Sequence, residues 1–77
     1  MVRERTTEIL AELVANVMSV TVAEGDVVAA GDTVVILESM KMEIPVIVEQ
    51  PGTIKAIKVA EADVVQEGDV LMEISLA

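Results

Sequence analysis

The feature that most constrains the fold of this chain is an internal repeat. Residues 22–37, VAEGDVVAAGDTVVIL, align with residues 59–74, VAEADVVQEGDVLMEI, at an offset of 37, with eight of the sixteen positions identical. Each copy reads as a strand, an acidic turn, a short Val-Val strand, a Gly-Asp turn and a longer strand. Two copies are too few for a solenoid. The repeat therefore predicts two similar halves related by a pseudo-twofold axis.

Composition supports strands throughout. Val, Ile and Thr occupy 27 of the 77 positions, and these β-branched residues favour strands over helices. Because 53% of the residues are hydrophobic, the chain is not a disordered tail. Together with the repeat, this predicts an all-β domain, a sandwich or flattened barrel of short antiparallel strands.

Missing residue types exclude several functions. The chain has no His and no Cys, which excludes Ser-His and Cys-His nucleophiles, a structural zinc site and disulfides. Its net charge of −9 and its lack of aromatic residues argue against nucleic acid and against anionic membranes as partners. The first ten residues, MVRERTTEIL, do not resemble a secretory signal, and no apolar run is long enough to span a membrane. We therefore expect a cytoplasmic protein.

Acidic turns punctuate both copies of the repeat. Glycine and aspartate mark the reversals, as in Glu24-Gly25-Asp26 and Gly31-Asp32. These turns lack the alternating ligand spacing of a calcium loop, so we interpret them as turns and expect no metal site. Ala62 stands where the first copy has Gly25, from which we expect no positive φ at that turn.

The N-terminal segment is ambiguous, because several apolar residues in it have helical spacing. These are Ile9, Leu10, Leu13, Val14 and Val17. The repeat argues against a helix, since residues 17–22 align with residues 54–59 of the second half. We therefore predict strands over residues 9–14 and 16–22, preceded by a flexible tail over residues 1–8.

One segment departs from the rules of its own local structure. Two β-prone runs within residues 33–48 flank the centre Glu-Ser-Met-Lys-Met-Glu, which predicts a hairpin with Met40-Lys41 at its apex. Tight hairpin turns favour Asn-Gly or Asp-Gly, and two methionines at a loop tip would be exposed although apolar residues are usually buried. Such local violations are often functional sites.

Residues 38–43, Glu-Ser-Met-Lys-Met-Glu, resemble the attachment motif of biotin carboxyl carrier domains in the biotinyl/lipoyl attachment family. The similarity runs from about residue 11 to the end, which implies an attachment domain over residues 9–77. It implies the family's barrel-sandwich hybrid of two four-stranded antiparallel sheets. Ser39 stands where the family commonly has Ala, and Pro51-Gly52-Thr53 keeps a motif that the first half lacks.

By this resemblance Lys41 corresponds to the lysine that is biotinylated, and Met40 and Met42 to the recognition residues that flank it. Glu38 and Ser39 are the other residues that we assign to the cofactor site. The resemblance implies a non-catalytic carrier, monomeric in isolation, that is modified by a biotin protein ligase. The attached biotin would shuttle a carboxyl group between the biotin carboxylase and the carboxyltransferase of a biotin-dependent, acyl-CoA-type carboxylase. A free-standing biotinylated protein, a lipoyl carrier (typically Asp-Lys-Ala at the tip) and a structural β-domain are the alternatives.

Overall fold

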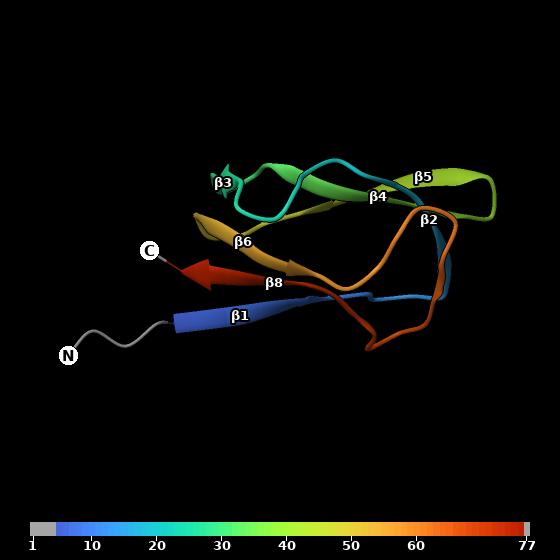
Figure 1. Ribbon diagram of the computed structural model, residues 1–77. Helices are drawn as coiled ribbons and strands as arrows, with labels where there is room; N and C mark the ends of the chain where they lie inside the picture. Colours follow the sequence, from blue (N-terminus) through green and yellow to red (C-terminus); the bar gives the residue numbers. More distant parts are fainter. Residues whose placement is uncertain (1–4, 77) are drawn as a thin grey trace.

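The computed structural model describes residues 5–76, and all regular structure in that range is β-strand. The strands are β1 (Arg5–Leu10), β2 (Ala15–Val20), β3 (Val27–Val28), β4 (Thr33–Ser39), β5 (Met42–Ile47), β6 (Gly52–Ile57), β7 (Val64–Val65) and β8 (Val70–Leu76). They form two four-stranded antiparallel sheets, ordered β1-β8-β6-β3 and β5-β4-β2-β7 (Figure 1). This confirms the predicted all-β sandwich. Over the same range, no helix exists that would be long and apolar enough to cross a membrane.

Pseudo-twofold symmetry relates the two halves strand by strand. The bounds of β5, β6, β7 and β8 follow from those of β1, β2, β3 and β4 at the offset of 37 that the repeat showed. The register irregularity between Val17 and Ser19, where β2 pairs with β4, recurs between Ile54 and Ala56, where β6 pairs with β8. The repeat therefore predicted the symmetry correctly, and the structure shows that the symmetry extends to the position of a bulge.

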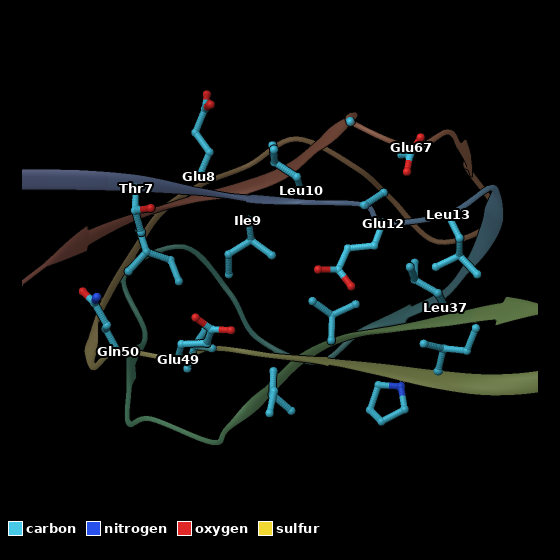
Figure 2. A pocket seen from close by; sticks show the side chains of 18 residues that line it. Thr7, Glu8, Ile9, Leu10, Glu12, Leu13, Leu37, Glu49, Gln50 and Glu67 are labelled. Atoms are coloured by element: carbon cyan, nitrogen blue, oxygen red, sulfur yellow. The ribbon is translucent and has the colours of Figure 1, made fainter.

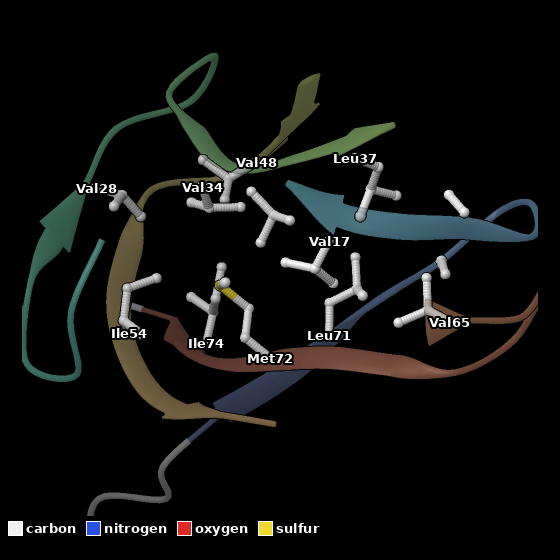
Figure 3. Close-up of a cluster of buried hydrophobic side chains, with 13 residues drawn as sticks. Val17, Val28, Val34, Leu37, Val48, Ile54, Val65, Leu71, Met72 and Ile74 are labelled. Atoms are coloured by element: carbon white, nitrogen blue, oxygen red, sulfur yellow. The ribbon is translucent and has the colours of Figure 1, made fainter. Parts of the chain in front are cut away.

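The core lies between the two sheets and is made only of aliphatic side chains (Figure 3). It consists of Ala11, Ala15, Val17, Val28, Val34, Val35, Leu37, Val48, Ile54, Val65, Leu71, Met72 and Ile74. Among the described residues, no polar or charged side chain is buried. Burial of aliphatic surface in this layer is therefore the main stabilising contribution, and small branched residues fill it without any aromatic ring.

The same four-residue turn occurs four times, over residues 23–26, 29–32, 60–63 and 66–69. In each, the backbone N–H of the first residue donates to the carboxylate of the closing aspartate at 2.8 to 2.9 Å. The N–H of that aspartate donates back to the first residue's carbonyl oxygen at 3.0 to 3.1 Å. These carboxylates thus satisfy turn amides, which supports the interpretation of the acidic segments as turns.

The third residue of each turn has positive φ, which corrects the prediction made for Ala62. Its φ is +77°, close to the +93° of Gly25 in the first copy. The only positive φ in each turn is at its third residue, which is typical of a type II turn. Equivalent hydrogen bonds impose the shape, because the Ala62 amide donates to the Val17 carbonyl as the Gly25 amide does to that of Ile54, at 2.8 Å each.

Replacing Ala62 by Gly should therefore stabilise the fold. An alanine in the left-handed region costs about 1–2 kcal/mol, and the extra freedom that glycine gives the unfolded chain offsets about 0.4–1 kcal/mol of the gain. We expect Ala62→Gly to raise the free energy of unfolding by about 0.5–1 kcal/mol. Urea titration followed by circular dichroism measures it. The matched control Ala60→Gly lies in the same turn without positive φ and should not stabilise; a lower midpoint for Ala62→Gly would contradict the turn geometry.

The N-terminal predictions need correction. β1 spans Arg5–Leu10, so the tail predicted over residues 1–8 is wrong for residues 5–8, and residues 1–4 lie outside the described range. The strand predicted over residues 9–14 is wrong beyond Leu10, and the strand predicted over residues 16–22 is observed as Ala15–Val20. The strand begins as early as Arg5 because β1 pairs with β8 from that residue, which lies opposite Leu76. This pairing is the symmetry mate of the pairing between β5 and β4.

Candidate functional site

The tip of the β4–β5 hairpin holds the lysine singled out by the sequence. Ser39 pairs with Met42, which leaves Met40 and Lys41 as a two-residue loop and confirms the predicted apex. Their φ values are +52° and +65°, both in the left-handed region. Positive φ at both central residues is the signature of a type I′ turn, whose twist matches that of the flanking strands.

This turn is strained by its own residues. A left-handed conformation costs a non-glycine residue about 1–2 kcal/mol, and here two adjacent residues adopt it. Asn-Gly would form the same turn with little strain. The Met40 and Lys41 side chains therefore do not serve the stability of the hairpin, and strain of this kind tends to persist at functional sites.

The side chains at the tip are open to solvent. Met40 is 92% exposed and Met42 is 66% exposed, and Lys41 between them is also exposed. Within residues 5–76, the Lys41 ammonium has neither a hydrogen-bond nor an ion-pair partner, whereas Lys55 does have an interaction. The amine of Lys41 is thus accessible and unconstrained, as an attachment site for a group delivered by another protein requires.

Two carboxylates stand at the base of the loop. Glu38 on β4 lies directly opposite Glu43 on β5, and both are exposed. Like charges directly opposite each other destabilise a strand pair, so this pair too is not explained by the fold. The hairpin brings all five predicted residues, 38 to 42, together. Glu43 belongs to the motif over residues 38–43 but was not among the predicted site residues, although a two-residue loop at Met40-Lys41 necessarily places it opposite Glu38.

Ser39 takes no part as a nucleophile. It is half-buried at the last position of β4, and the chain has no histidine to act as its base. Its small side chain instead lies next to the loop, opposite Met42 on the neighbouring strand. Among the described residues, acylation at this end of the molecule would therefore fall on the primary amine of Lys41.

The ends of the described chain lie far from Lys41. Arg5 pairs with Leu76, and this pair is the pseudo-symmetry mate of the Met42–Ser39 pair that supports the loop. The β1–β8 end therefore occupies the place equivalent to the Lys41 hairpin, at the opposite end of the sandwich (Figure 1).

A groove lies between β1 and β5, the edge strands of the two sheets. The lining of this open groove of about 800 Å³ includes the apolar Ile9 and Val46. The side chains of Glu12 and Glu49 also line it (Figure 2). Lys41 and its flanking methionines do not line it. Across residues 5–76, no cluster of three acidic, His or Cys residues is placed to hold a metal ion. The groove is therefore separate from the Lys41 site.

Comparison with known proteins places the site in a family. A family model described as "Biotin-requiring enzyme" matches residues 7–74. A biotinylated protein TB7.3 homolog of Mycolicibacterium smegmatis is 60% identical over 40 residues, which are 52% of this chain and 56% of that protein. The chain thus spans little more than half of that relative's length. A biotin/lipoyl attachment protein of Bacillus subtilis is 47% identical over 64 residues, which are 83% of this chain and 88% of that protein.

Solved structures share the fold as one small part of large chains. A single-chain, multi-domain long-chain acyl-CoA carboxylase matches with a TM-score of 0.89 and 28% identity over 94% of this chain and 7% of its own. The urea carboxylase of Kluyveromyces lactis matches with a TM-score of 0.86 and 30% identity over 96% of this chain and 6% of its own. These matches, with the family model over residues 7–74, confirm the resemblance seen in the motif: this chain belongs to the biotin/lipoyl attachment domain family.

Proposed function

We propose that this protein is a biotin carrier in which the amine of Lys41 forms an amide with the carboxyl group of biotin. The observation that carries the proposal is the exposed Lys41, without a partner among residues 5–76, at the apex of a strained turn between Met40 and Met42. The relatives from Mycolicibacterium smegmatis and Mycobacterium leprae are described as biotinylated proteins. The geometry supplies the accessible amine, and the descriptions of these relatives favour biotin as the attached group.

The residues present fit such an attachment. Forming an amide requires an accessible amine that can reach an activated acyl group on a ligase, and it does not require a desolvating pocket. The β4–β5 ladder runs through six paired positions, from Thr33 opposite Ile47 to Ser39 opposite Met42. It therefore presents Lys41 on a firm support, while the lysine side chain itself stays free to extend.

The proposed role of the domain is to carry a group between other active sites. When bound, biotin supplies a ring that accepts and releases a carboxyl group. We propose a biotin protein ligase, a biotin carboxylase and a carboxyltransferase as partners, with an acyl-CoA as the acceptor. The chain's own contribution is a tether and a recognition surface, because tethering turns each encounter into a local one at high effective concentration.

An experiment with two ligases distinguishes between biotin and lipoate, the two cofactors of this family. The purified protein is incubated with ATP and either biotin plus a biotin protein ligase or lipoate plus a lipoate ligase, and intact mass and a peptide map are recorded. We expect one biotinyl group, on the peptide that contains Lys41. If the protein is lipoylated and not biotinylated, it is a lipoyl carrier and the proposal is wrong. If neither ligase modifies it, the domain has a structural role instead.

Placement of the chain ends leads to a further expectation. A small folded tag joined at either terminus should leave the biotinylation rate unchanged, because Arg5 and Leu76 lie at the end of the sandwich opposite Lys41 (Figure 1). The rate of mass gain is measured for both tagged proteins beside the untagged chain. A marked slowing with the C-terminal tag alone would contradict the pseudo-twofold placement of the site.

A further inference from the structure

Methionine is the residue type through which an oxidant can reach this site. The chain has no Cys, Trp, Tyr or His, so the thioethers of its five methionines are its readily oxidised side chains. Exposure among the four in the described range is uneven: 92% for Met40, 66% for Met42, 42% for Met18 and 0% for Met72. The two most exposed methionines of this range therefore flank Lys41.

The fold itself does not require methionine at these positions. The pseudo-symmetry mate of Met42 is Arg5, which occupies the same place in the strand β1. Met40 adopts a left-handed conformation that Asn or Gly would adopt with less strain. Both side chains extend into solvent and contribute little to the core. What they offer at the tip is a flexible apolar surface with an oxidisable sulfur atom.

We propose that Met40 and Met42 form a peroxide-sensitive modification site that controls whether Lys41 can be modified. The inference rests on the proposed biotinylation of Lys41. A thioether sulfur attacks one oxygen of hydrogen peroxide, the O–O bond breaks, and an S–O bond forms. The sulfur loses two electrons, the peroxide is reduced, and water leaves. A methionine sulfoxide reductase reverses the step.

The physical consequence is a change in the surface that a ligase meets. The sulfoxide is polar and chiral, whereas the thioether is apolar. A ligase groove suited to two apolar thioethers beside Lys41 has no need of a hydrogen-bond donor at that place. A sulfoxide oxygen would therefore be buried there without a hydrogen bond, which is unfavourable. Oxidation of one or both residues should therefore slow attachment of biotin by about tenfold or more.

The first measurement establishes the order of oxidation. The unmodified protein, which lacks biotin's own sulfur, is treated with hydrogen peroxide, and oxygen gain is mapped by peptide mass spectrometry while circular dichroism monitors the fold. We expect Met40 and Met42 to react first, Met18 more slowly, and Met72 not at all while the protein stays folded. Oxidation of Met72 as fast as Met40 in folded protein would overturn the proposal.

The second measurement is the biotinylation rate before and after peroxide, each variant being compared with its own untreated sample. Wild type and Met18→Leu should slow by about tenfold or more and recover after sulfoxide reductase treatment. The double variant Met40→Leu/Met42→Leu should show no peroxide effect, whatever its untreated rate. Equal rates before and after complete oxidation of wild type would overturn this inference alone, whereas an untreated wild type that accepts no biotin would overturn the proposed function and this inference with it.

Discussion

Lys41→Arg should abolish biotinylation entirely. Arginine keeps the positive charge, but its guanidinium does not form the amide that the lysine amine forms with an activated carboxyl group. The fold should be unaffected, because the side chain is exposed and has no partner within residues 5–76. Coexpression with a biotin ligase, followed by intact mass measurement, gives the result directly.

A matched control uses another exposed lysine. Lys58, whose backbone amide donates to the Leu71 carbonyl oxygen, lies in the loop after β6, and Lys58→Arg should be biotinylated at the wild-type rate. Modification of Lys41 also removes one positive charge from a chain of net charge −9, so isoelectric focusing offers a second readout. Biotin found on the Lys41→Arg protein would show that the attachment site has been assigned to the wrong residue.

Much of this architecture could be predicted because the repeat is visible in the turns. The four Asp-closed turns and the Val-Val pairs are similar in both halves, and their offset of 37 is also the offset between the strands. β1 could not be found this way. Its sequence, RTTEIL, is identical to MEIPVI of its mate β5 at no aligned position. It also shows no apolar alternation, and five of its six residues are exposed. Pairing with β8 alone makes it a strand.

Backbone conformation was the least predictable part of the structure. Because Ala62 replaces the Gly25 of the first copy, the sequence predicted no positive φ at Ala62. Equivalent long-range hydrogen bonds nevertheless hold both residues at positive φ. The glycine of Pro51-Gly52-Thr53, a motif that only the second half has, is also explained by a tertiary contact. A Cβ on Gly52 would lie 2.5 Å from the Ser75 carbonyl oxygen, whereas its mate Ala15 is accommodated, 5% exposed.

The candidate site was predictable for the opposite reason, since it conflicts with local preference. Met40-Lys41 is a poor sequence for a tight turn, and Glu38 opposite Glu43 is a poor strand pair. Each conflict is visible in the sequence once the hairpin is recognised. The left-handed dihedrals and the absence of any partner for Lys41 among the described residues required the three-dimensional structure.

The choice of cofactor should depend on the residues that flank Lys41, because a biotinyl and a lipoyl carrier would present their lysines on the same hairpin. We expect the double variant Met40→Asp/Met42→Ala to be biotinylated at least about tenfold more slowly than wild type. The aspartate would bring an unpaired carboxylate into a ligase groove suited to apolar thioethers, and desolvating that charge is unfavourable. The fold should persist, because the replaced side chains are 92% and 66% exposed.

Val27→Asp is the matched control for the added charge. Val27 is 81% exposed on β3, opposite Thr53 and remote from the Lys41 hairpin, so this variant should be biotinylated at the wild-type rate. Intact mass with a biotin ligase and with a lipoate ligase, each supplied separately, reports both modifications for all three proteins. If the double variant is slowed and Val27→Asp is not, the ligase reads the residues beside Lys41 and not the overall charge. If the double variant is biotinylated as fast as wild type, the apolar surface next to the amine has been removed without any effect on the rate. Recognition by the ligase would then depend on the hairpin backbone or on more distant residues.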